Sequence, residues 1–404
     1  MAPISMDPAV LTDAAVTYET ARASADKVVD DLAAALDSNW GCAGSDSAGA
    51  TWAEGYDPAA YDAVAGGTVI VNAFGKMHDL LAVTAVNHAN TERANTNPPE
   101  PPESPPAELP TMGAPAFKGA FGGDADEPFG WGLISSWLQG HTWPNGDPDK
   151  LRALASAWRG AATGLRASVD GTGSLFAKFE DIESGEVPQI LAQMDLVFSD
   201  AEHVATQYEN LASSCDEWAG QIEDAHGKVL AILAGALGVG LIAGGIAGFF
   251  TAGTGTVAVT GATGSAAGAS IVGVLVAFDT AAAAAVGATV AAGVAVGGVA
   301  TELQPLLDAN PTVFGANTSG GGGGAHHYVK PPKDLPGFPN AKPLKKMAPR
   351  YRERWQDADG TTYEWDYQHG AVEKYSKNGK HLGEFDANTG AQTKPPEPGR
   401  KPGR

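Results

Sequence analysis

Apolar residues recur three and four positions apart along two stretches of the chain, which is the spacing of one face of an α-helix. In the first stretch, residues 1–93, the pattern runs from Leu11 to Leu36. Gly, Asp and Pro residues interrupt it between Trp40 and Gly67, and a second helix is expected at Val69–Ala89. The pattern therefore predicts a helical domain in residues 1–93.

The second stretch, residues 131–226, has a clear helix start and a long apolar stripe. Asp147-Pro148-Asp149 places a capping carboxylate before a Pro at the first helical position. Another helix is expected to begin near Pro188, and its apolar residues alternate four and three positions apart. We predict a hairpin of packed helices, the second of which carries the seam Ile190, Met194, Val197, Ala201, Val204, Tyr208, Leu211, Cys215, Trp218 and Ile222.

Two segments of biased composition separate regions of regular pattern. Eight prolines lie between Pro98 and Pro115, so residues 94–130 are predicted to form an extended Pro-rich linker. Residues 302–325 end in the five glycines Gly320–Gly324, a composition typical of a flexible hinge. We therefore expect the residues after the hinge to form a separate module.

Residues 229–301 are almost uncharged, with Asp279 as the only ionisable side chain. Val229–Phe250 is long enough to span a bilayer as a helix, and Gly residues recur there every fourth position from Gly240 to Gly248. Ala281–Ala300 is a second Gly/Ala-rich stretch. The segment is either a membrane-inserting helical hairpin or an element packed within the protein, and composition favours neither.

The pattern changes again in residues 326–404. After a Pro- and Lys-rich arm come four short, β-prone, aromatic runs: Arg352–Gln356, Thr361–Tyr367, Ala371–Ser376 and His381–Asp386. Asp359-Gly360, His369-Gly370 and Asn378-Gly379 separate them, and Asp-Gly and Asn-Gly are strong hairpin signals. The chain is therefore predicted to be multidomain. All-α regions and an apolar helical segment precede a small, twisted antiparallel sheet of about four strands.

Charge is distributed unevenly along the chain. The net charge is −21, yet residues 326–404 carry 15 Lys and Arg against 10 Asp and Glu. This asymmetry fits a polyanion partner or simply a solvated basic tail. Cys42 and Cys215 have no zinc-binding spacing, and the first residues do not resemble a classical signal peptide. The protein is expected to be cytosolic or to be secreted by another route.

Three polar residues on the predicted sheet could perform chemistry. Asp366, His369 and Glu373 lie within eight residues, on neighbouring strands whose facing side chains are about 5–8 Å apart. A carboxylate and a histidine at that range can act as the base and the acid of metal-free RNA cleavage. Spacing alone favours a turn histidine between solvated carboxylates, and it is poor for a metal site.

Basic and aromatic residues surround these three. The cations are expected to hold phosphates, and the rings could stack on splayed bases. The predicted RNA-binding residues are Lys345, Lys346, Arg350, Arg352, Arg354, Lys374, Lys377 and Lys380, with Trp355, Tyr363 and Tyr367.

The helical region resembles a family of secreted proteins. Trp158-Arg159-Gly160 and Trp218-Ala219-Gly220 are Trp-x-Gly tripeptides, and His141–Gly160 reads HTWPNGDPDKLRALASAWRG. Together they resemble the WXG-type helical domains of actinobacterial type VII secretion substrates, over roughly residues 115–226. The resemblance implies that the type VII machinery is a partner and that residues 131–226 form a WXG-like helical hairpin.

The C-terminal module resembles the cytotoxic domain of E-type colicins and related pyocins over roughly Arg352–Arg400. The similarity lies in Tyr-Glu-Trp-Asp-x-Gln-His-Gly-x-x-Glu and the later His-Leu-Gly-x-Phe-Asp-x-x-Thr-Gly. It implies cleavage of small-subunit ribosomal RNA at the decoding centre. Because the residues show no ligand cluster of metal spacing, we expect neither a cofactor nor a metal. A cognate immunity protein is also implied.

The resemblance implies roles for four residues and contains one departure. It makes Glu373 the base, His369 the acid, Asp366 an orienting carboxylate and Arg400 the phosphate clamp, while an acidic position of the family motif is Ala371 here. Two alternatives remain. The chain could be a type VII secreted, membrane-acting or interaction protein with an RNA-binding tail, or its nuclease could act on transfer or messenger RNA.

Overall fold

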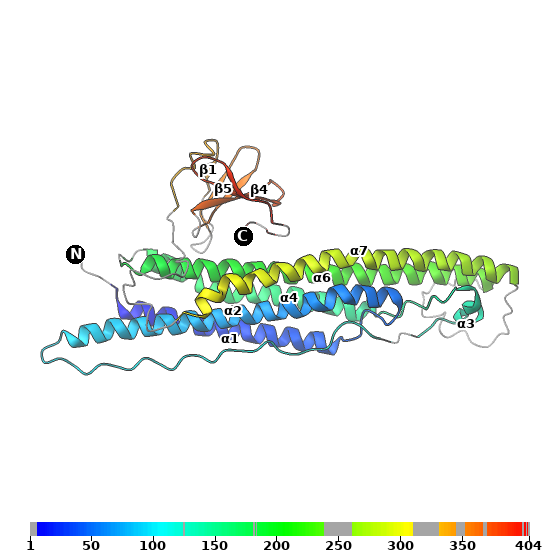
Figure 1. Cartoon of the computed structure of the whole chain (residues 1–404), viewed down its shortest axis with the longest axis horizontal. Helices are drawn as coiled ribbons and strands as arrows, with labels where there is room; N and C mark the ends of the chain where they lie inside the picture. The colour runs from blue at the N-terminus through cyan, green and yellow to red at the C-terminus, as the bar shows by residue number, and fades with distance from the viewer. Residues whose placement is uncertain are drawn as a thin grey trace.

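A long helical bundle carries a small β-sheet on its flank in the computed structural model (Figure 1). The structure describes residues 6–123, 126–180, 182, 184–237, 261–309, 331–344, 352–366, 370–397, 400 and 402, without the side chains of 237, 261–263 and 287–297. The predicted hinge Gly320–Gly324 and the Gly240–Gly248 repeat lie outside these residues. The multidomain prediction, with helices first and a sheet last, is confirmed.

The first two helices are α1 (Pro8–Ser38) and α2 (Ser47–Ala94). The prediction that α2 begins at Val69 was wrong, because Asp46 caps a helix that continues through Pro58. Its glycines are packing positions. A Cβ at Gly67 would overlap the Tyr208 hydroxyl, so glycine lets the helices approach closely.

The second helical region begins with α3 (Trp131–Ile134) and the 3-10 turn η1 (Ser135–Trp137), followed by α4 (Pro148–Thr172). Asp147 caps α4 by accepting from the backbone amides of Asp149 and Lys150, as predicted. After α5 (Ser174–Glu180), helix α6 (Val187–Leu237) begins where the sequence indicated. Every residue of its predicted seam is buried.

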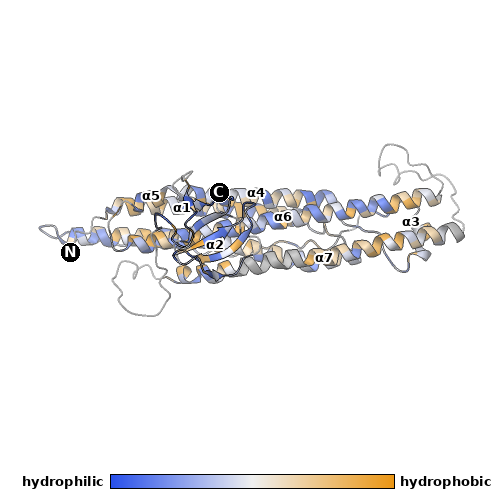
Figure 2. Cartoon of the chain, turned by 90° about the horizontal axis from the view of Figure 1, so that it is seen from above, coloured by the Kyte–Doolittle hydropathy of each residue, from blue (hydrophilic) through white to orange (hydrophobic). Residues whose placement is uncertain are grey.

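Helix α7 (Gly261–Leu307) lies along α2 and α6 and contributes Phe278 to the bundle core. Its Gly264–Val286 stretch has a mean hydropathy of 2.0 and is long enough to span a membrane, yet only 22% of it is buried. Figure 2 shows hydrophobic residues along the described part of α7, whereas α4 and α6 also carry many hydrophilic ones. A helix with this composition and burial can pack against the bundle, and it can also insert in a membrane.

Aromatic side chains join the two helical regions in one core. Trp218 stacks between Trp52 and Phe278, with ring centroids 5.8 and 4.8 Å away, and the Trp158 indole donates to the Tyr56 hydroxyl at 2.7 Å. Both Trp-x-Gly tryptophans are therefore interior residues of helices, held by partners on α2.

The Pro-rich segment runs extended along the outside of α1 and α2 (Figure 1). Buried or half-buried side chains of α2 hold its backbone. Asp79 accepts from the amide of Leu109, and Asn72 exchanges two hydrogen bonds with Met112. Proline cannot donate to such contacts, and the bonds accordingly fall between the prolines.

The sheet has six antiparallel strands in the order of the sequence. They are β1 (Lys342–Pro343), β2 (Arg354–Gln356), β3 (Thr362–Asp366), β4 (Ala371–Tyr375), β5 (His381–Asp386) and β6 (Gln392–Lys394). The four predicted strands are present, and Gly360 and Gly379 adopt positive φ in the turns that join them. The edge strands β1 and β6 were missed because each is very short and exposed, without alternating apolar residues.

Candidate active site

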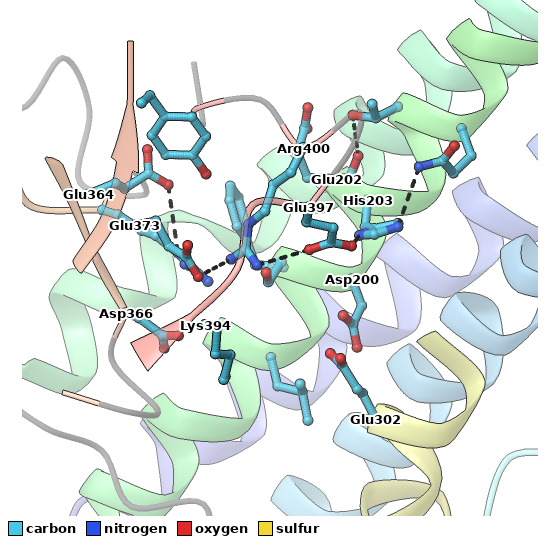
Figure 3. Close-up of a pocket in the computed structure, with 17 residues that line it drawn as sticks. Asp200, Glu202, His203, Glu302, Glu364, Asp366, Glu373, Lys394, Glu397 and Arg400 are labelled. Atoms are coloured by element: carbon cyan, nitrogen blue, oxygen red, sulfur yellow. Dashed lines mark hydrogen bonds and ion pairs between the residues drawn. The ribbon is translucent and has the colours of Figure 1, made fainter. Parts of the chain in front are cut away.

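A polar cleft lies between the sheet and α6, and the predicted catalytic residues that the structure describes line it (Figure 3). Strand β3 contributes Asp366, β4 contributes Glu373, and the C-terminal tail returns to place Arg400 beside them. Residues of α6, including Asp200 and His203, form the facing wall. The predicted acid, His369, is outside the described residues.

Glu373 is the centre of this arrangement. Its carboxylate is 2% exposed, and it accepts from His381 Nε2 at 2.6 Å and pairs with Arg400 Nη2 at 2.9 Å. Burial opposes its ionisation, but the His381 hydrogen bond and the Arg400 charge outweigh burial and lower the pKa of Glu373. The carboxylate is therefore held in the form that can accept a proton.

His381 was not recognised from the sequence as a functional residue. Its Nδ1 accepts from the backbone amide of Glu397 at 2.9 Å, so the ring proton must be on Nε2, facing Glu373. A neutral imidazole thus orients the carboxylate and fixes the tail at the same point. The available signal was its place as first residue of β5, which pairs with β4 two residues beyond Glu373.

Arg400 connects the sheet to the tail. Its guanidinium contacts Glu373 Oε1 at 2.9 Å and Glu397 Oε2 at 3.3 Å, and 27% of the side chain is exposed. A partly exposed guanidinium beside a buried carboxylate is suited to bind a phosphate at the mouth of the cleft. Sequence spacing could not place Arg400 here, because 27 residues separate it from Glu373.

Asp366 ends β3 directly opposite Ala371 on β4, and both are buried. An acidic side chain in place of Ala371 would add a second negative charge beside Asp366, which is buried with only 5% of its surface exposed. The alanine therefore limits repulsion in this buried acidic site.

Asp366, Glu373 and Glu384 are close enough to be considered as metal ligands, with one oxygen of each within 4.8 Å of the others. Cationic side chains already neutralise two of them. Arg400 pairs with Glu373, and Lys394 Nζ lies 2.9 Å from Glu384. This donor set resembles an acid–base site stabilised by side-chain cations more than a metal site.

The predicted RNA-binding residues that the structure describes fall into three groups. Trp355 and Tyr363 are each 2% exposed in the sheet core, so their burial leaves no ring face for a base. Arg352 and Arg354 are engaged in ion pairs, with Asp195 and Glu364 respectively. Lys374 is half-buried and lies over aromatic rings, and Lys377 and Lys380 are exposed. Lys345, Lys346, Arg350 and Tyr367 lie outside the described residues.

Two family models match separate parts of the chain. Residues 329–402 match the family model described as Cytotoxic, and residues 124–264 match the model described as WXG100 like domain.

Three relatives each match part of the chain. The outer membrane channel protein CpnT of Mycobacterium tuberculosis is 32% identical over 242 residues, 58% of this chain and 28% of CpnT. Colicin E3 of Escherichia coli is 46% identical over 67 residues, 16% of this chain and 12% of the colicin. Cloacin of E. coli is 42% identical over 82 residues, 18% of this chain and 15% of cloacin.

The chain thus spans between about an eighth and just over a quarter of the length of these relatives. Both resemblances seen in the sequence are confirmed. The C-terminal sheet is similar to the cytotoxic domains of colicin E3 and cloacin, and the helical region carries a domain similar to the WXG100 type.

Proposed function

We propose that the protein is a secreted toxin whose C-terminal domain, residues 326–404, is an endoribonuclease. Its target is small-subunit ribosomal RNA at the decoding centre, and cleavage stops translation. The observation that carries the proposal is the buried, ionised Glu373 between His381 and Arg400. The match of residues 329–402 to the Cytotoxic model supports it.

The chemistry is an intramolecular transesterification. Glu373 removes the proton of a ribose 2′-hydroxyl, and the 2′-oxygen attacks the adjacent phosphorus. The P–O5′ bond breaks, His369 donates a proton to the departing 5′-oxygen, and a 2′,3′-cyclic phosphate remains. Arg400 stabilises the extra negative charge of the phosphorane, and Asp366 orients the acid. No redox partner or metal is needed for this balance.

Partners and delivery follow from the two similarities. The WXG100-like domain supports export by a type VII secretion machinery. The ribonuclease then acts in the cytoplasm of a target cell. A cognate immunity protein protects the producer, and an acidic surface on it would complement the basic domain.

A second candidate function concerns α7. Its apolar stretch Gly264–Val286 has a mean hydropathy of 2.0 and is 22% buried, which favours an ability to enter a bilayer. The helix would then help the toxin cross the target membrane. Dye release from lipid vesicles by the full chain, compared with a Val276→Asp variant, tests this role, because Val276 is 49% exposed on α7. Equal release by the two proteins contradicts it.

The ribonuclease proposal is tested by incubating purified ribosomes, transfer RNA and messenger RNA separately with the C-terminal domain. A single break in small-subunit ribosomal RNA supports it. Breaks confined to transfer or messenger RNA would support the alternative nuclease, and binding without any break would support the RNA-binding tail.

A further inference from the structure

The cleft that holds Glu373 and Arg400 is closed on one side by the protein's own helix α6 (Figure 3). Two contacts hold the helix there. Arg352 Nη2 lies 3.2 Å from Asp195 Oδ2, with side chains 9% and 3% exposed. At the other end, His203 Nδ1 lies 3.6 Å from Glu397 Oε1. The two pairs are 157 and 194 positions apart in the chain, so they bring the sheet and the tail into contact with the bundle.

The facing wall is acidic. Helix α6 presents Asp200 and Glu202, and Glu302 of α7 lies beside them. They share the cleft with the cations Arg352, Lys394 and Arg400 of the sheet and tail. RNA would bring its phosphates to those same cations. Asp195 of α6 thus presents to Arg352 the negative charge that a substrate phosphate would present.

The continuous set of contacts runs from the reacting carboxylate to the helix. Glu373 pairs with Arg400, Arg400 with Glu397, and Glu397 with His203 of α6. Glu373 is 2% exposed in the whole chain. Helix α6, about 10 Å wide with its side chains, forms the facing wall of the cleft, so an RNA strand that binds Arg352, Lys394 and Arg400 together would have to displace it.

We propose that the α6 face bearing Asp195, Asp200 and His203 is an intramolecular inhibitor that occupies the RNA-binding side of the C-terminal domain. The partner of this surface is the domain itself, recognised through its guanidinium groups. The intact chain is then latent, and release of the sheet from α6 activates it. This inference rests on the proposed ribonuclease function, and it explains how a producer can hold the toxin safely before export.

The test uses the full chain and three variants. Asp195→Asn removes the buried partner of Arg352, and His203→Ala removes the contact with Glu397. Asp216→Asn is the matched control, since Asp216 lies on α6 but pairs with Arg159 of α4, away from the cleft. Hydrogen exchange of β3–β5 and of residues 190–207 reports whether the sheet has left the helix.

Binding of a fluorescent RNA oligonucleotide is measured by anisotropy at fixed salt. We expect faster exchange and at least tenfold tighter RNA binding for Asp195→Asn and for His203→Ala, with Asp216→Asn like the parent. The proposal is overturned if the parent binds RNA as tightly as the opened variants, or if neither substitution raises exchange.

Cleavage of purified ribosomes by the same proteins separates the two claims. An opened variant that binds RNA tightly but leaves ribosomal RNA intact refutes the proposed ribonuclease, while the covering role of α6 stands. An opened variant that both binds and cuts, beside a slow parent, supports both. Equal cutting by parent and opened variants refutes inhibition and leaves the ribonuclease in place.

Discussion

Replacing Glu373 by glutamine keeps the shape of the side chain and removes the proposed base. Loss of a general base typically slows cleavage about 10²–10⁴-fold, or about 2.7–5.5 kcal/mol in the barrier. The substitution also weakens two charge-assisted contacts, from His381 at 2.6 Å and Arg400 at 2.9 Å. Each such contact is worth about 1.5–3 kcal/mol.

The remaining contacts limit the loss of stability that Glu373→Gln causes. Arg400 is 27% exposed and keeps Glu397, and the glutamine oxygen can still accept one hydrogen bond. We therefore expect a loss of about 2–4 kcal/mol in unfolding free energy. Even a domain with about 5 kcal/mol of stability stays mostly folded. Unfolding then lowers the rate less than about twofold, so a hundredfold loss must come from the chemistry.

The assay is single-turnover cleavage of purified ribosomes by residues 326–404, with circular dichroism and thermal melting of each variant. Glu384→Gln is the matched control. Glu384 lies opposite Glu373 on β5, is 4% exposed, and also pairs with a cation, Lys394. It should melt earlier but cut within about threefold of the parent. If both glutamine variants lose the same large factor, the three carboxylates act together, as in a metal site, and the base assignment is wrong.

Four further predictions concern the same domain. Because the pKa of Glu373 lies below its ordinary value, the acid limb, on which the cleavage rate falls as pH falls, should lie below about pH 5, and an acid limb above pH 5 would argue against Glu373 as base. A separate fall of the rate toward high pH is expected as the acid His369 loses its proton. His381→Phe should raise that pKa and shift the acid limb of the profile to higher pH, whereas a purely structural role would lower the rate equally at every pH. Excess chelator should leave cleavage unchanged, and activity lost to chelator and restored by added metal would contradict an acid–base site. Lys377→Ala, an exposed change, should weaken RNA binding and flatten its salt dependence without changing the single-turnover rate at saturation.

Much of the fold was predictable from the sequence, because strong local signals agreed with the packing. Asp147 capped its helix, the α6 seam became core, and the Asp-Gly and Asn-Gly pairs became turns. Helix α2 was mispredicted because Gly67 was interpreted as a helix breaker. Glycine is needed at this position because the Tyr208 side chain of α6 lies against it. Spacing along one segment cannot reveal such a contact between helices.

The site was predictable only where its residues are neighbours along the chain. Asp366 and Glu373 lie on neighbouring strands of one hairpin, Asp366 opposite Ala371 and Glu373 opposite Glu364, so they are diagonal neighbours. The role of His381 and the position of α6 over the cleft depend on tertiary contacts. The tail, for example, must fold back before the Glu397 amide can reach His381. The burial of Trp355 and Tyr363 also escaped prediction. A thin sheet needs these rings as its core, so aromatic content alone did not indicate a stacking surface.

The central claim is that the C-terminal domain cuts ribosomal RNA with Glu373 and Arg400 in its active site. The most direct measurement is primer extension on ribosomes treated with residues 326–404, alongside Glu373→Gln and Arg400→Ala. We predict one break in small-subunit RNA at the decoding centre with the parent domain, and at least a hundredfold slower appearance of that break with either variant. Intact ribosomal RNA with the parent domain, or equal cleavage by all three folded proteins, would contradict the account.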